Sequence, residues 1–173
     1  MKKLLLILLC LPMVGFGQIT MIPDTSFENY LISQGLDFTL DGIVLTSAID
    51  SVTELHLDNK GIHSLEGLQD FSSIKTLYCY SNNLTSIDLN YNTQLIELNI
   101  KDNNLSNIDL SNNYNLEVLN IGQGYSGNNI SILNLNNQPN LKILNCSSNP
   151  ITSLNLANNI QLEHISAELT QLT

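Results

Sequence analysis

The stretch Leu95–Asn115 reads LIELNIKDNNLSNIDLSNNYN, and most of the chain is a repetition of it. Its apolar side chains recur at fixed places, with an asparagine, Asn103, at the ninth: Leu95, Leu98, Ile100, Leu105, Ile108 and Leu110. The same arrangement occurs 21 residues earlier, and it returns from Leu141 onward. Self-similarity at such a period indicates a solenoid, in which each unit buries its apolar face against its neighbours.

Six blocks of this kind follow one another from Val52 to Thr173. Their bounds are 52–73, 74–94, 95–115, 116–140, 141–161 and an incomplete 162–173. The fourth block has four extra residues in the glycine-rich segment Gly122–Gly127, which we interpret as an inserted loop. Alternation such as Leu98 and Ile100 predicts one short, half-buried strand per block. A block this short has no room for a full helix as well, so we expect extended or turn segments opposite the strands.

The spacing L-x-x-L-x-L-x-x-N-x-L over Val52–Thr173 resembles the leucine-rich repeat. The 21-residue length and the tail [IL]-[DN]-L-x-x-N are similar to the internalin-like class of secreted bacterial proteins. The resemblance implies a curved leucine-rich-repeat solenoid with a parallel β-sheet on its concave face, a small helical N-terminal cap and a binding role. Residues 22–24, 27–28 and 41–46 also resemble the cap that precedes such repeats in these relatives.

The first 17 residues have the composition of an export signal. Lys2 and Lys3 precede the apolar run Leu4–Val14, and Gly15-Phe16-Gly17 fits a cleavage site with small residues. The apolar run is too short to span a bilayer. We therefore predict a signal peptide at 1–17 and a secreted or cell-surface protein whose mature chain begins at Gln18.

Residues 18–51 lack the repeat pattern and are expected to form the cap that covers the first repeat. Thr25-Ser26-Phe27-Glu28 fits a capping box, which predicts a short helix from about Ser26 to Gln34 that Gly35 ends. Asp41-Gly42 predicts a turn before the apolar run Ile43–Leu45.

The ninth place of the block is an asparagine in the four interior repeats and another residue at both ends, where Lys60 and Thr170 stand. We expect these amides to form a buried column that satisfies backbone groups at the turn after each strand. The predicted structural column consists of Asn82, Asn103, Asn128 and Asn149.

The side chains that alternate with the buried leucines are expected to face the concave side. Tyr78 and Tyr80 are the aromatic residues of that array, and aromatic residues ringed by polar ones are typical of binding hot spots. The alternative is that the two tyrosines only cover sheet surface. Tyr125, on the inserted loop, would lie at the rim. The predicted ligand-binding residues are Tyr78, Tyr80, Glu54, His56, Asp58, Glu97, Asn99 and Lys101.

Other motifs do not carry a functional prediction. Gly122–Gly127 matches G-x-G-x-x-G, but no helix begins after it, so we interpret it as a loop rather than a phosphate cradle. Glu54, His56 and Asp58 alternate as metal ligands do, yet any acidic surface offers the same set. We predict no metal, no cofactor and no catalytic residue, because no nucleophile has a base placed beside it by any motif.

Charge narrows the range of partners. Without the signal peptide, four lysines stand against sixteen acidic residues, a net charge near −12 with no arginine, which excludes a basic patch for nucleic acid. The favoured function is a secreted protein-interaction module that binds its partner on the concave sheet. A glycan-binding adhesin is the second hypothesis. Because the last block stops halfway at Thr173, the third is a truncated fragment of a larger surface protein.

Overall fold

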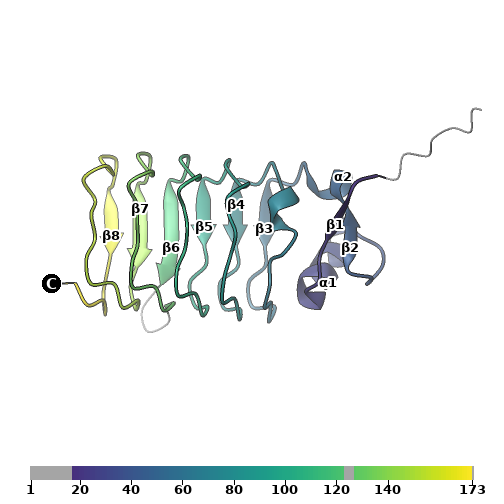
Figure 1. The fold of residues 1–173 in the computed structure, drawn as a ribbon, viewed down its shortest axis with the longest axis horizontal. Coiled ribbons are helices and arrows are strands. Elements are labelled where there is room, and N and C mark those ends of the chain that lie inside the picture. The colour runs from purple at the N-terminus through teal and green to yellow at the C-terminus, as the bar shows by residue number, and fades with distance from the viewer. Residues whose placement is uncertain (1–16, 123–126, 173) are drawn as a thin grey trace, which may run out of the picture.

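The computed structural model describes residues 17–122 and 127–172. The predicted signal peptide lies outside the described residues except for Gly17, and so do residues 123–126 of the predicted insertion, Tyr125 included. The described chain is an elongated stack of coils with a mixed α/β cap at its N-terminal end (Figure 1).

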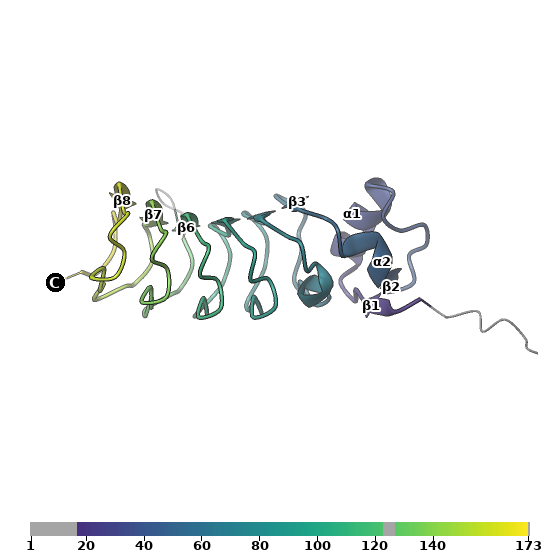
Figure 2. The ribbon, with the colours of Figure 1, turned by 90° about the horizontal axis from the view of Figure 1, so that it is seen from above.

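Six short strands, one per repeat, form a parallel sheet along one long side of the stack (Figures 1 and 2). Neighbouring strands pair in register one repeat apart, with Leu55, Leu77, Leu98, Leu119, Leu144 and Ile165 aligned across the sheet. The predicted parallel sheet is therefore confirmed. The strands are β3 (Glu54–His56), β4 (Thr76–Tyr78), β5 (Glu97–Asn99), β6 (Val118–Gly122), β7 (Ile143–Cys146) and β8 (His164–Ser166).

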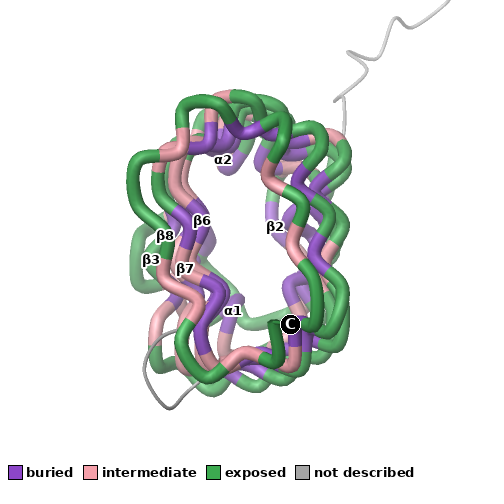
Figure 3. Tube along the Cα trace, turned by 90° about the vertical axis from the view of Figure 1, so that its left-hand side faces the viewer, coloured by how far each residue is buried: buried purple, intermediate pink, exposed green. Residues whose placement is uncertain are grey.

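The apolar positions of successive coils stack into one continuous core. Leu77, Leu98 and Leu119 are fully buried behind the sheet, and Leu89 and Leu110 are buried on the opposite wall. Viewed along the stack, the buried positions recur on both walls of a flattened ring (Figure 3). The wall opposite the sheet consists of turns, with the 3-10 helix η1 (Leu68–Asp70) in the first repeat.

Five of the six coils leave their strand through a non-glycine residue in the left-handed region. These residues have φ between 54° and 56°, and they occupy the same place in five repeats. Non-glycine residues adopt this conformation rarely, and asparagine and aspartate do so most readily. The positions are Asn59, Ser81, Asp102, Ser148 and Leu169.

The asparagine column lies directly after these turns and joins each coil to the one before it. Asn103 Nδ2 donates to Cys79 O of the preceding coil (3.0 Å) and to Ile100 O of its own coil (3.2 Å). Its Oδ1 accepts from Leu84 N (3.0 Å). Asn82, Asn128 and Asn149 repeat this geometry with their own neighbours.

A second amide column, which the sequence analysis did not assign, lies on the opposite wall. Its members are buried, and each donates to a backbone carbonyl of the preceding coil: Asn92 to Leu68 O, Asn113 to Leu89 O, Gln138 to Leu110 O and Asn159 to Leu135 O. Asn92, Asn113 and Asn159 are the last letter of the L-x-x-N tail, and Gln138 replaces it in the fourth repeat, so the sequence did carry a signal for this column.

The cap closes the N-terminal end of the core. Strand β1 (Ile19–Met21) pairs antiparallel with β2 (Ile43–Leu45), and helices α1 (Thr25–Ser33) and α2 (Thr46–Ile49) flank this pair. Phe27 of α1 stacks on Phe71 of the first repeat, with ring centroids 5.9 Å apart. No helix in residues 17–122 and 127–172 is long and apolar enough to cross a membrane.

The predicted capping box is wrong in its residues. Asp24, one position earlier, caps α1 by accepting from Ser26 N (2.9 Å) and Phe27 N (3.0 Å). Glu28 does not reach back to the helix start; it accepts from Asp41 N and Gly42 N and holds the turn before β2. The helix consequently begins and ends one residue earlier than predicted.

The second carboxylate oxygen of Asp24 ties the cap to the first repeat. It accepts from His63 N (2.7 Å) and Ser64 N (3.0 Å). Burial raises the pKa of Asp24, but the backbone hydrogen bonds from His63, Phe27, Ser64 and Ser26 outweigh that effect and lower it below its usual value. One carboxylate thus both starts the helix and joins two structural units.

The glycines that bound the inserted segment are explained by packing. A Cβ at Gly122 would lie 1.8 Å from Ser147 O, and one at Gly127 would lie 1.9 Å from Ser148 O. Both places are where the fourth coil contacts the fifth, and β6 changes register against β7 at Gly122. No side chain fits there, which accounts for two glycines of the G-x-G-x-x-G match without a nucleotide.

Candidate functional site

The side chains on the outer side of the sheet form rows across the strands, and we call this surface the strand face. Strand register aligns one row as Glu54, Thr76, Glu97, Val118, Ile143 and His164. It aligns the next as His56, Tyr78, Asn99, Asn120, Asn145 and Ser166. The predicted ligand-binding residues of β3 to β5 therefore lie side by side, whereas the Asn82–Asn149 column lies in the interior.

Tyr78 is the centre of a contact network on strands β3, β4 and β5. The ring of His56 meets the ring of Tyr78 edge-on, with centroids 5.1 Å apart and planes at 82°. His56 Nε2 lies 3.6 Å from a carboxylate oxygen of Glu54. On the other side, Tyr78 is hydrogen-bonded to the side chain of Glu97. Four predicted residues thus form one connected cluster.

The cluster is electrostatically biased toward a neutral Tyr78. The hydrogen bond to Glu97 raises the pKa of Tyr78 to about 12, with further contributions from burial and from the charges of Glu97, Asp58 and Glu54. A phenol that stays protonated keeps its hydrogen bond to the carboxylate. The ring is therefore held in place before any partner arrives.

Tyr80 is fixed by a different pair of contacts just beyond the end of β4. The ammonium of Lys101 lies over the Tyr80 ring, 5.1 Å from its centroid. The backbone N–H of Tyr80 donates to Asp58 Oδ1 (3.2 Å), and burial raises the pKa of Asp58. Both tyrosines are half-buried rather than fully exposed, because these neighbours cover part of each ring.

Asn99 adds an unused acceptor beside Tyr78. Its Oδ1 is buried and has no hydrogen-bond partner among the described residues, and Asn120 Oδ1 in the next strand shares this property. We call the eight residues of this region the tyrosine site: Glu54, His56, Asp58, Tyr78, Tyr80, Glu97, Asn99 and Lys101.

The cap contributes a residue that the repeat pattern could not reveal. Tyr30 of α1 accepts a hydrogen bond at its hydroxyl from His56 N (3.3 Å), and Lys60 lies over its ring, 5.2 Å from the centroid. Tyr30 therefore extends the aromatic surface from β3 onto the cap. In the sequence it appears only as a helical residue on the face of Phe27 and Leu31.

The tyrosine site presents aromatic rings, carboxylates, an ammonium and amide oxygens side by side on three strands. Across the ranges that the structure describes, no group of three histidine, cysteine, aspartate or glutamate side chains has the arrangement to hold a metal ion. Cys79 and Cys146 are free and buried in the core, away from this face.

Comparison with solved structures places the architecture among known proteins. Internalin C2 from Listeria monocytogenes superposes with a TM-score of 0.79 at 22% identity, over 88% of this chain and 68% of that one. The chain has a leucine-rich-repeat fold. The functional domain of InlJ from the same organism matches with a TM-score of 0.57 at 22% identity, over 91% of this chain and 44% of that one.

A third leucine-rich-repeat protein, LIC12759 from Leptospira interrogans, matches with a TM-score of 0.66 at 20% identity, over 74% of this chain. Two of these three chains are much longer than this one, which spans 44% of InlJ and 34% of LIC12759. No family model matches the sequence. No curated protein sequence matches it either.

Proposed function

We propose that this leucine-rich-repeat chain is a protein-binding module and that the tyrosine site is where its partner docks. The observation that carries the proposal is the network around Tyr78, in which His56 and Glu97 on the two neighbouring strands fix one aromatic ring. Leucine-rich-repeat and related solenoids use their extended sheet surface to bind. Aromatic anchors that are already ordered lose little entropy on binding.

We also propose where the protein meets its partner and what role it has there. The basic residues and apolar run of 1–17 support export, so the partner would be met outside the cell or at its surface. The adaptor role and the absence of catalysis are part of the proposal. Two observations support them. The strand face presents aromatic and charged groups that a partner could contact, and the fold is similar to that of internalin C2.

The composition of the site favours a protein over a glycan. A sugar stacks on an open aromatic face. Here Lys101 covers one face of Tyr80, and Tyr78 is engaged by His56. Three carboxylates beside one lysine and one histidine suit a partner surface with basic and hydrogen-bonding groups.

The test is affinity capture followed by site-directed variation. The purified chain is immobilised and exposed to extracellular protein fractions and to a glycan array, and retained proteins are identified by mass spectrometry. We expect one protein partner to be retained by the native chain. Tyr78→Ala combined with Tyr80→Ala should reduce its affinity by at least about tenfold, as expected for a hot spot.

A matched pair of substitutions controls for general damage. Asp88→Ala with Asp109→Ala alters exposed positions outside the strand face and should leave capture unchanged. Circular dichroism and melting curves should be alike for both double variants. Retention of glycans alone would contradict the proposal and favour an adhesin. Loss of capture in the aspartate pair alone would move the site off the strand face.

A further inference from the structure

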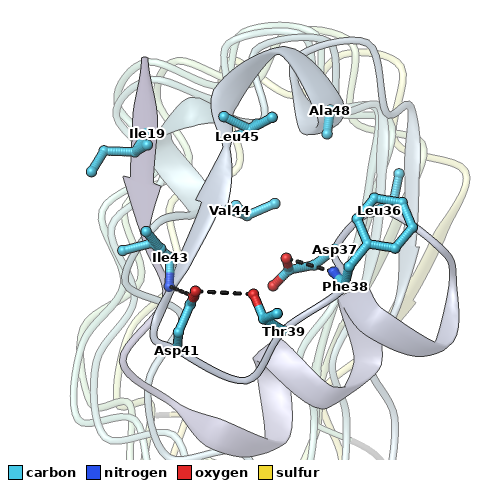
Figure 4. Close-up of a pocket in the computed structure, with 10 residues that line it drawn as sticks. All are labelled: Ile19, Leu36, Asp37, Phe38, Thr39, Asp41, Ile43, Val44, Leu45 and Ala48. Carbon is cyan, nitrogen blue, oxygen red and sulfur yellow. Dashed lines mark hydrogen bonds between the residues drawn. The ribbon is translucent and has the colours of Figure 1, made fainter. Parts of the chain in front are cut away.

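The outer end of the cap contains an apolar pocket that the repeats do not use. Its volume is about 260 Å³, and it lies between β2, α2 and the segment that follows α1 (Figure 4). Leu36, Val44, Leu45 and Ala48 supply its apolar surface. This volume lies just below the roughly 300–1,000 Å³ of pockets that hold whole small-molecule ligands.

One carboxylate in this pocket is buried without a partner for one of its oxygens. Asp37 is 8% exposed, and its Oδ1 accepts from Phe38 N (2.7 Å). Its Oδ2 is buried and has no hydrogen-bond partner among the described residues. Figure 4 shows the carboxylate directed into the space between Val44 and Thr39. A buried charge of this kind is costly unless something pairs with it.

The surroundings of the pocket favour a ligand with an apolar stem and a cationic end. Phe38, which lines the pocket, is 88% exposed, and Ile19 and Leu45 are exposed lining residues as well. Exposed apolar groups gathered around a pocket mark an interaction site. Residues 18–51 contain no lysine, arginine or histidine to neutralise their five acidic residues, which are Asp24, Glu28, Asp37, Asp41 and Asp50.

We propose that this pocket receives a lysine side chain from an apolar segment of a partner protein, at a second docking site separate from the tyrosine site. The methylene stem lies against Val44 and Ala48, and the ammonium pairs with Asp37 Oδ2. A lysine ammonium can pair with Oδ2 alone, whereas a guanidinium commonly binds a carboxylate through both oxygens, and here Oδ1 also accepts from Phe38 N. Long lysine stems commonly bury themselves in this way beneath a charged end.

The probe is a short peptide, acetyl-Gly-Leu-Lys-Leu-Gly-amide, titrated into the isotopically labelled chain while backbone amide resonances are followed. We expect saturable shifts at Phe38 and Val44. Asp37→Asn keeps the acceptor for Phe38 N but removes the charge, and it should weaken binding by at least about tenfold. Asp41→Asn is the matched control. Asp41 lines the same pocket, but Ile43 N and Thr39 Oγ1 already occupy its oxygens, so binding should be retained.

Three results would overturn the proposal. The first is equal binding of the same peptide with Nε-acetyl-lysine, a comparison that uses only the native chain and so does not depend on how Asp37→Asn folds. The second is n-butylammonium binding as tightly as the peptide, which would assign the pocket to a free amine. The third is self-association in sedimentation that Asp37→Asn abolishes, which would make a second copy the occupant. The Tyr78→Ala, Tyr80→Ala variant should bind the peptide as the native chain does, because the tyrosine site is separate from this pocket.

Discussion

At the scale of single residues, the amide columns explain the role of seven buried asparagines. A leucine can fill a core, but it leaves the backbone groups at each turn without partners. One amide can donate to two carbonyls and accept from one N–H, as Asn103 does, so it satisfies a turn and joins two coils at once. On the opposite wall, Asn113 Nδ2 likewise donates to two backbone carbonyls, Leu89 O and Asn92 O.

We predict that both columns contribute to stability. Asn103→Ala and Asn113→Ala each strip buried backbone groups of their partners, and each should lower the free energy of unfolding by about 1–3 kcal/mol. Asn107 is exposed in the same coil, so Asn107→Ala should change it by less than about 0.5 kcal/mol. Urea denaturation of the three variants measures this. Equal losses at Asn107 and Asn103 would contradict the role of the column.

The titration of Tyr78 tests the network of the tyrosine site. Its pKa is raised from 10.0 to about 12, chiefly by the hydrogen bond to Glu97. A raised pKa adds stability that is fully present below pH 10 and is lost as the pH rises through about 12. Glu97→Gln should move one tyrosine to a lower pKa in an alkaline absorbance titration. Tyr78→Phe should remove that same titration step, and an unchanged curve for Glu97→Gln would show that the two side chains do not interact.

At the scale of elements, the structure shows which features a sequence pattern can predict. The six strands, their register and the interior asparagine column follow from a period that repeats often enough to average out exceptions. The cap occurs once, and the predicted box begins at Thr25, one residue after the observed N-cap Asp24. Asp24 prevails because its second oxygen also binds the first repeat, a contact 39 residues away that no local pattern contains.

The candidate site also has features that the sequence could predict and features that it could not. Alternation along β3 to β5 places Glu54, His56 and Tyr78 on one face, so their proximity was predictable. The hydrogen bond between Tyr78 and Glu97 was not predictable, because it depends on how the two side chains lean across neighbouring strands. Tyr30 enters from the cap. The pocket around Asp37 is formed by segments without repeats, and it had no sequence signal.

Asp24 should matter more than an ordinary helix cap. Asp24→Ala removes the two N-terminal hydrogen bonds of α1 and the two bonds to His63 N and Ser64 N. A cap alone is worth about 0.5–2 kcal/mol, and hydrogen bonds to a charged group about 1.5–3 kcal/mol, so we expect a loss of about 2–4 kcal/mol. Thermal denaturation measures it, with the exposed Glu66→Ala as control.

The pH dependence of the same contact has a defined sign. Because the pKa of Asp24 is lowered from 3.8, its contribution is present above that value and is lost as the pH falls through the folded-state pKa. The native chain should therefore lose more stability on acidification than Asp24→Ala does. Parallel acid-denaturation curves for the two chains would contradict the assignment.

At the scale of the whole molecule, the fold keeps the repeated residues in the interior and places the varied residues on the strand face. Leucines and amides repeat from coil to coil in the interior, while the strand face changes from coil to coil. Its aromatic and charged groups gather over β3 to β5, beside the cap, whereas Val118 and Ile143 occupy the same row farther along. A partner that docks on the tyrosine site would contact the first three coils and Tyr30.

The most direct measurement is hydroxyl-radical footprinting of the chain with and without its captured partner, because the chain contains its own reference tyrosines. Tyr91 and Tyr114 are 67% and 52% exposed outside the strand face. We expect the partner to reduce oxidation of Tyr78, Tyr80 and His56 by several-fold while Tyr91 and Tyr114 react as before. Protection of Tyr91 or Tyr114, with Tyr78 and Tyr80 unchanged, would contradict recognition on the strand face.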